Sequence, residues 1–164
     1  MKTYFLFCIL FFTVLFTKTV YSQDFPYQEY KSRTLSEFAE MDSDVTKRDY
    51  KEKQLLIHAK PFYSAIRVKY VGTSRPISTD KKNLFKLWQG SIGYDPKILT
   101  LLENEYLFKE CDKEYWIPVQ KQVAAYFPKE MKEGDMITLY LMAVGGLKIT
   151  DKWEFVYLVN EYKK

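Results

Sequence analysis

The first hydrophobic segment of the chain is an unbroken apolar run from Tyr4 to Phe16, preceded by the basic residue Lys2. As a helix this run spans roughly 20 Å, which is shorter than a hydrocarbon core of about 30 Å. Val20 and Ser22 are the β-branched and small residues that a signal peptidase accepts near its cleavage point. The pattern predicts a signal peptide over residues 1–22, cleaved after Ser22, and the alternative is an uncleaved membrane anchor.

The next stretch, residues 23–52, is polar and charged, with scattered aromatic residues. Within it Leu35, Phe38 and Ala39 recur at helical spacing, which is typical of a short amphipathic helix over residues 34–45. Two interpretations stay open here, a short helix or a mobile polar arm. The remaining residues, 53–164, contain no internal repeat and are predicted to form a single β-rich domain.

Strands are predicted where apolar and polar residues alternate, or where a short run is apolar on both faces. The clearest alternation covers residues 63–71, and the most apolar segment covers residues 136–144. The other predicted strands are 55–57, 103–110, 115–117 and 153–160. Trp153 and Phe155 share one face of the last strand, and we expect both to lie in the core.

Helices and turns are predicted from their end signals. Thr79 is expected to cap a helix over residues 80–89 that Gly90 ends, and Pro118 is expected to open a helix over residues 119–127. The loops and turns are predicted at 72–78, 111–113 and 133–135, with a tight reversal at Gly145–Gly146.

The resulting order is three strands, a helix and two strands, with one further helix after the first strand. This order predicts an α+β fold, mainly antiparallel β, in the form of a small OB-like or SH3-like barrel with two short helices. An open α+β sheet has the same order of elements and remains the alternative.

Charge and cysteine content limit the functions that the mature chain can have. The full chain has 25 basic and 21 acidic residues, and removal of residues 1–22 takes two lysines and no acid, so the mature protein is nearly neutral. We therefore do not expect nucleic-acid binding, and we expect membrane contact only through the signal peptide before cleavage. Cys111 is the one cysteine left, which excludes an intramolecular disulfide. The predicted location is secreted or periplasmic.

Motifs for catalysis, metals and cofactors are absent from the sequence. The lone histidine, His58, has no nucleophile or acid beside it in the sequence, and one histidine with one cysteine cannot form a standard zinc site. We therefore predict no cofactor and no metal. An acidic cluster is the alternative site, because paired carboxylates can hydrolyse glycosides. Its members are Glu103, Glu105, Glu110, Asp112 and Glu114.

Aromatic residues are the clear excess, at 18% of the chain. We predict a ligand surface at Tyr115, Trp116, Gln120 and Gln122, where a strand passes into a helix and glutamines offer donors and acceptors. The predicted function is a non-catalytic binding domain for a protein or a glycan. The alternatives are a hydrolase that uses the acidic cluster and an OB-type binder of an anionic polymer that uses Arg67 and Lys69.

Overall fold

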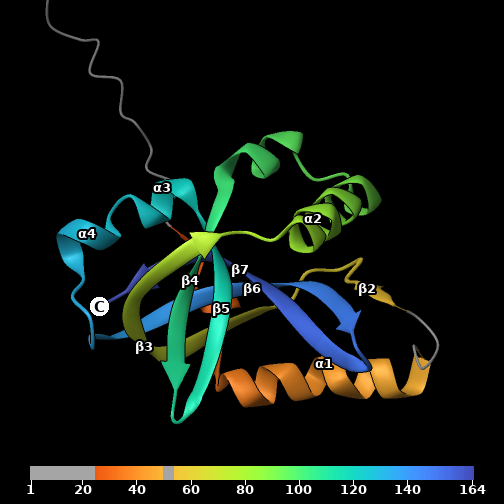
Figure 1. The fold of residues 1–164 in the computed structure, drawn as a ribbon, viewed down its shortest axis with the longest axis horizontal. Helices are drawn as coiled ribbons and strands as arrows, with labels where there is room; N and C mark the ends of the chain where they lie inside the picture. Colours follow the sequence, from red (N-terminus) through yellow and green to blue (C-terminus); the bar gives the residue numbers. More distant parts are fainter. Residues whose placement is uncertain (1–24, 50–53) are drawn as a thin grey trace, which may run out of the picture.

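The computed structural model describes residues 25–49 and 54–164, with the backbone alone for 45–49 (Figure 1). The predicted signal peptide and its cleavage point lie outside the described residues. The first elements are η1 (Tyr27–Glu29), β1 (Lys31–Arg33), α1 (Leu35–Asp49), β2 (Leu55–Ile57), β3 (Tyr63–Pro76), α2 (Thr79–Ile92) and η2 (Pro96–Leu101). They are followed by β4 (Leu102–Glu110), β5 (Lys113–Gln120), α3 (Lys121–Ala124), α4 (Phe127–Glu130), β6 (Met136–Ile149) and β7 (Lys152–Lys163).

The described strands form one mixed sheet of seven strands. The long strand β3 pairs antiparallel with β6 through its first half and with β4 through its second half. β4 and β5 form an antiparallel hairpin, β5 meets β7 in parallel at Val119 and Val159, and β7 pairs antiparallel with β6. The short strands β1 and β2 extend the sheet from β3 and β6. The sheet and its helices confirm the predicted α+β class with mainly antiparallel strands.

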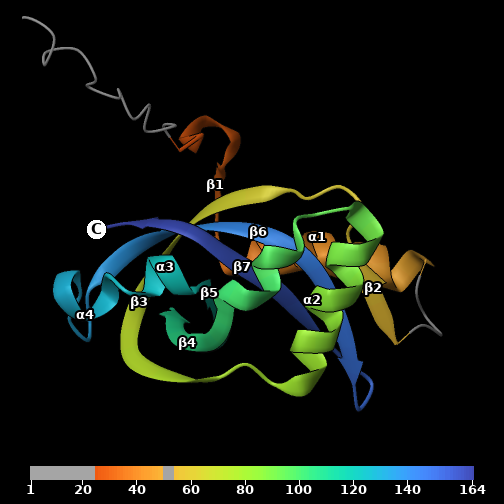
Figure 2. The ribbon, with the colours of Figure 1, turned by 90° about the horizontal axis from the view of Figure 1, so that it is seen from above.

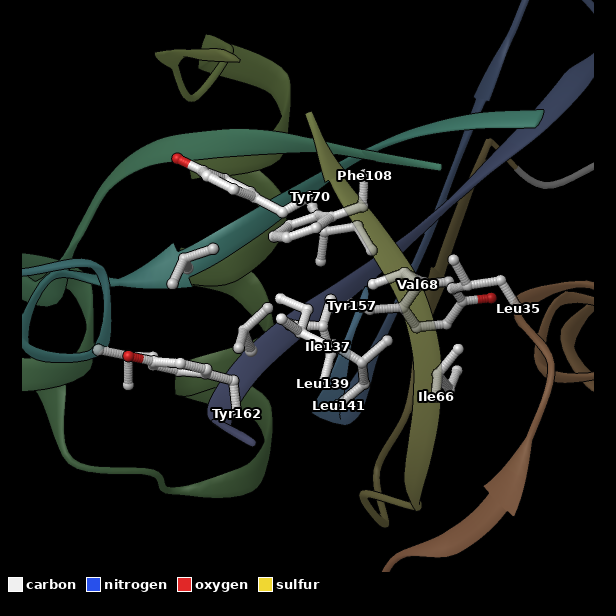
Figure 3. Packing of buried hydrophobic residues seen from close by; sticks show 14 of the residues in the cluster. Leu35, Ile66, Val68, Tyr70, Phe108, Ile137, Leu139, Leu141, Tyr157 and Tyr162 are labelled. Carbon is white, nitrogen blue, oxygen red and sulfur yellow. The ribbon is translucent and has the colours of Figure 1, made fainter. Parts of the chain in front are cut away.

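One face of the strands encloses a core of aliphatic and aromatic side chains, shown in Figure 3. Ile66 and Val68 from β3 meet Leu139 and Leu141 from β6, and all four are at most 1% exposed. Helix α1 adds Leu35 and Phe38 to the same core. The structure therefore contains the amphipathic helix that the spacing of these residues predicts, and this helix packs on the sheet.

The opposite face of β6 and β7 carries a second core, to which α2 contributes. Figure 2 shows the ribbon of α2 beside these strands. Leu84, Phe85 and Trp88 of α2 are at most 1% exposed and pack against apolar side chains of the two strands. Helix α2 begins after Ser78, whose hydroxyl accepts a hydrogen bond from the Lys81 backbone N–H, and it ends at Gly93 with a φ of 66°. The helix is thus longer than predicted, because Gly90 adopts helical geometry and does not end it.

The helix predicted over residues 119–127 is wrong. β5 continues to Gln120, and only two single turns, α3 and α4, follow it. Pro118 lies inside β5 as the register partner of Glu105. Ile117 and Val119 flank it and both belong to the enclosed core, so the packing of this strand outweighs the preference of proline for a helix start.

The tight reversal predicted at Gly145–Gly146 is also wrong, because β6 passes through both glycines. The chain turns instead at Thr150 and Asp151, which have φ values of 43° and 64°. A Cβ at Gly145 would lie 2.1 Å from the carbonyl oxygen of Leu56. The glycine therefore permits β2 to approach β6 closely, which explains its position within a strand.

The loop predicted over residues 72–78 is mostly strand. β3 continues to Pro76 after a register shift against β4 between Tyr70 and Ser74, and Gly72 has a φ of 79° within this irregularity. The shift resembles the effect of a β-bulge, which redirects a strand without ending it. It carries Arg75 to a position opposite Glu105 on β4.

Candidate functional site

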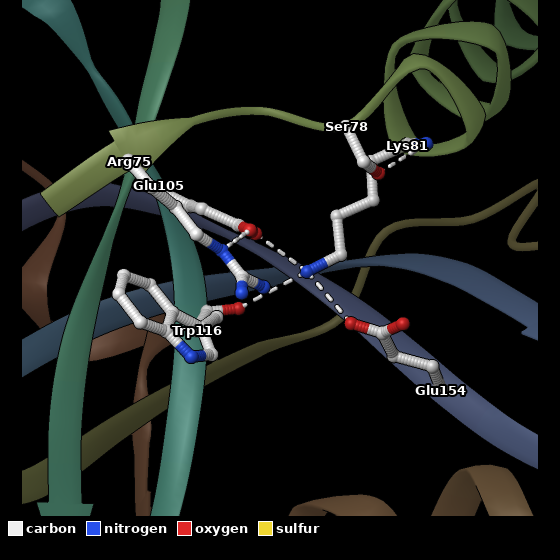
Figure 4. A network of polar contacts seen from close by, with 6 residues as sticks. All are labelled: Arg75, Ser78, Lys81, Glu105, Trp116 and Glu154. Carbon is white, nitrogen blue, oxygen red and sulfur yellow. Dashed lines mark hydrogen bonds and ion pairs between the residues drawn. The ribbon is translucent and has the colours of Figure 1, made fainter.

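A buried lysine lies at the centre of a network of polar contacts that joins four strands and a helix (Figure 4). Lys81, in the first turn of α2, is 3% exposed. Its Nζ lies 2.5 Å from Oε2 of Glu105 and 2.7 Å from Oε1 of Glu154, and it donates a longer hydrogen bond of 3.4 Å to the carbonyl oxygen of Trp116. Glu105 itself is 1% exposed. Buried charges require this kind of pairing, because neither can be solvated by water.

Arg75 completes the network from β3. Its Nε donates a hydrogen bond of 2.5 Å to Oε1 of Glu105, so the two oxygens of this carboxylate bind two different cations. The guanidinium carbon of Arg75 lies 4.0 Å from the centre of the Trp116 ring, the geometry of a cation–π contact. The Arg75 side chain is 49% exposed. A solvent-accessible guanidinium is thus held in place by a buried acid and an aromatic ring.

Strand register places these groups on one face. Arg75, Glu105 and Pro118 are register partners across β3, β4 and β5, and Leu107 pairs with Trp116 in a neighbouring row. Alternate residues such as Phe108 and Ile117 belong to the enclosed core. Arg75, Glu105 and Trp116 therefore lie on the face turned away from that core, which we call the Trp116 face.

The four predicted ligand residues are divided between two faces. Trp116 lies in the network, whereas Tyr115 is partly buried and packs against the enclosed core. Gln120 donates a hydrogen bond of 2.8 Å to Asn160, and Gln122 donates one of 3.0 Å to Gln120. The structure thus brings the two glutamines together but not Tyr115 with Trp116, because adjacent strand residues point in opposite directions. Ligand binding by these residues stays a prediction.

The predicted acidic cluster is dispersed among separate partners. Glu103 pairs with Lys121 at 2.5 Å and Glu114 pairs with Lys109 at 2.8 Å. Glu110 accepts hydrogen bonds from the first two backbone N–H groups of α1, at 2.7 and 3.2 Å. Glu103, Glu105 and Glu114 therefore act in ion pairs. Glu110 places a negative charge at a helix N-terminus, where such a charge is stabilising. Asp112 is exposed in the turn between β4 and β5.

The one histidine of the chain contacts a buried acid that is distant in sequence. Nε2 of His58 lies 2.8 Å from Oδ1 of Asp42, which is fully buried on α1. The hydroxyl of Tyr157 donates to the other oxygen of Asp42 at 3.3 Å. Burial and the neighbouring carboxylate both raise the pKa of Tyr157. A carboxylate can orient a histidine for catalysis, but His58 is only 10% exposed, and its ring packs edge-on against Phe62.

Other chemical features of the described residues are simple. Cys111 is free and exposed in a turn with a φ of 52°. No group of three or more histidine, cysteine or acidic side chains in the described ranges is placed to hold a metal ion. Among the described helices, none has the length and apolar character needed to cross a membrane.

Comparison of the chain with protein-family models, with curated proteins and with solved structures finds no match.

Proposed function

We propose that the mature chain is an exported, non-catalytic binding module, and that its ligand contacts the Trp116 face. The observation that carries this proposal is the stacking of Arg75 on Trp116, supported from beneath by the buried pair of Glu105 and Lys81. Arginine and tryptophan side chains are frequent in binding hot spots, and in this pair Arg75 is exposed while Trp116 is partly buried. Here their orientation is already established before a ligand arrives, so less conformational entropy is lost on binding.

The strand pairings support an OB-type barrel as the framework of this module. β3, β4, β5, β7 and β6 pair in this order, and β6 pairs again with β3. α3 follows the third strand of this series. The same order, with a helix between the third and fourth strands, is expected for the OB fold, whereas α1 and α2 are additions to it.

The position of the Trp116 face supports the proposed ligand surface. OB folds bind oligonucleotides and oligosaccharides on the face of their second and third strands, between the first and last connecting loops. In the proposed alignment these strands are β4 and β5. The first connection contains α2 with Lys81, and Glu154 lies close to the last connection, so both flank Trp116 through the network.

A capture experiment tests the proposal. The mature protein, residues 23–164, is immobilised and exposed to extracts and glycan preparations from the compartment to which it is exported. Trp116→Ala is expected to abolish retention of specific partners. Tyr126→Ala is the matched control, because Tyr126 is 53% exposed and lies outside the network. If the wild-type protein and Trp116→Ala retain the same partners, the Trp116 face is not the binding surface.

Export requires its own test. Amino-terminal sequencing of protein recovered from the producing cells is expected to begin at Gln23. A chain that starts at Met1 would contradict the cleavage prediction, while the capture experiment would still report on the Trp116 face.

A further inference from the structure

The free donors of Arg75 indicate the chemistry of the ligand. We propose that the Trp116 face binds an acidic polysaccharide, a sugar chain that carries carboxylates; this inference rests on the proposed binding function. Glu105 occupies Nε of Arg75. Within the described part of the chain, the two terminal guanidinium nitrogens have no hydrogen-bond partner. An arginine fork of this kind matches the two oxygens of a carboxylate.

The fork is fixed in direction by its surroundings. Glu105 holds the Nε edge and Trp116 supports the guanidinium plane. The negative charge of Glu105 is also shared with Lys81, whose ammonium lies 2.5 Å from its other oxygen. Lys81 is in turn paired with Glu154 at 2.7 Å, so the charges of this network balance. The outward donors of Arg75 remain available to an anion, because Glu105 binds only its Nε.

A second cationic position lies on the same face. Lys69 of β3 and Lys109 of β4 are register partners and line a hollow of about 430 Å³ beside the irregular part of β3. Like charges directly opposite one another destabilise a sheet, and an anion between them relieves the repulsion. Two acids are nearby: Glu133 lines the hollow, and Glu114 pairs with Lys109 at 2.8 Å. That ion pair is exposed, so it competes weakly with a ligand.

The separation of the two positions favours a chain-like ligand. Glu105, opposite Arg75, and Lys109 are four residues apart on β4, which is roughly 13 Å at about 3.3 Å per residue. A single small anion cannot contact both positions. An oligomer with repeated acidic groups can place one on Arg75 and another on the lysine pair.

A polysaccharide fits this face better than a nucleic acid. Arg75 covers one side of the indole ring of Trp116. A base therefore cannot stack on that side of the ring, as bases do when proteins bind single-stranded nucleic acids. The nearly neutral mature chain also lacks the broad basic surface that phosphate polymers require.

Calorimetric titration of the mature protein tests the ligand class. The probe is polygalacturonate, and the matched control ligand is the same polymer with its carboxylates methyl-esterified. We expect binding to polygalacturonate and at least tenfold weaker binding to the ester. Arg75→Gln is expected to weaken polygalacturonate binding about tenfold or more, because it removes charge-assisted hydrogen bonds. Lys69→Gln is expected to weaken it less and to reduce its dependence on salt.

The control variant is Lys86→Gln, which removes an exposed positive charge on the outer surface of α2 and is expected to bind as wild type. Equal binding of the ester, or unchanged binding by Arg75→Gln, would overturn the acidic-ligand inference. Preference for single-stranded DNA or polyglutamate over polygalacturonate would also overturn it. These results differ from failure of the proposed function, which is marked by capture that is insensitive to Trp116→Ala.

Discussion

The buried pair of Lys81 and Glu105 makes a quantitative prediction about stability. Glu105→Ala removes the carboxylate and leaves the Lys81 ammonium, 3% exposed, in the protein interior. Breaking a buried ion pair by removal of one partner costs about 3–5 kcal/mol. Because Glu154 still lies 2.7 Å from the ammonium, we expect a loss near the lower limit, about 3 kcal/mol of the free energy of unfolding.

The paired replacement Lys81→Met/Glu105→Leu should behave differently. It removes both buried charges and supplies apolar side chains of similar size, and such exchanges are often neutral or stabilising. Arg75 and Glu154 are left with 49% and 43% of their side chains exposed, so both can be solvated. We expect a free energy of unfolding within about 1 kcal/mol of the wild-type value.

Urea denaturation followed by circular dichroism and by tryptophan fluorescence measures each variant, and the single variants Lys81→Met and Glu105→Leu complete a double-mutant cycle with the paired replacement. The expected result is strong non-additivity, with the double variant more stable than Glu105→Ala. A loss below about 1 kcal/mol for Glu105→Ala would refute the reasoning, as would a double variant whose loss equals the sum of the single losses.

Three further predictions concern other parts of the fold. Gly145→Ala is expected to lower the free energy of unfolding by about 3 kcal/mol or more, because the new Cβ would clash with Leu56. Gly90→Ala should raise it by about 0.5–1 kcal/mol, because this helical glycine has open space around it. Equal effects of the two substitutions in urea denaturation would refute this contrast. Glu110→Gln should lower the free energy of unfolding by about 0.5–2 kcal/mol, because Glu110 accepts hydrogen bonds from the first two backbone N–H groups of α1. Amide hydrogen exchange at the start of α1 should become faster, and unchanged exchange there would contradict the capping role of Glu110. Burial raises the pKa of Tyr30 from 10.0 to about 12, so the folded state holds this proton more tightly. Stability should therefore fall as the pH rises from 10.0 to about 12, and Tyr30→Phe should show a flatter fall in denaturation series; identical slopes would disprove this assignment.

Local patterns in the sequence predict most of the strands. Alternation in β3 and the apolar run in β6 are strong signals, and both strands occur where they are predicted. Strand ends are predicted less well, because tertiary pairing extends strands through residues that usually end them. Gly145 lies within β6 since β2 requires a close approach, and the reversal uses Thr150 and Asp151, which carry no glycine signal.

The Trp116 face is predicted only in part. Aromatic content draws attention to Trp116, but Tyr115 beside it faces the core, a division that follows from strand alternation once β5 is assigned correctly. Arg75 is not predictable as a site residue, because its position depends on the irregular register between β3 and β4. Glu105 is noticed as one acid of a cluster, while its buried partner Lys81 is distant in the sequence.

A shared signal nevertheless exists for two buried charged residues on the described helices, Lys81 and Asp42. Lys81 precedes Leu84, Phe85 and Trp88 at helical spacing, and all four side chains are buried on one side of α2. Asp42 occupies the corresponding kind of position on α1, and it is fully buried against His58. A charged residue at an apolar position of an amphipathic helix cannot be solvated after the helix packs, so it must acquire a partner. Such a residue predicts that a buried polar contact exists, whereas the identity of the partner requires the fold.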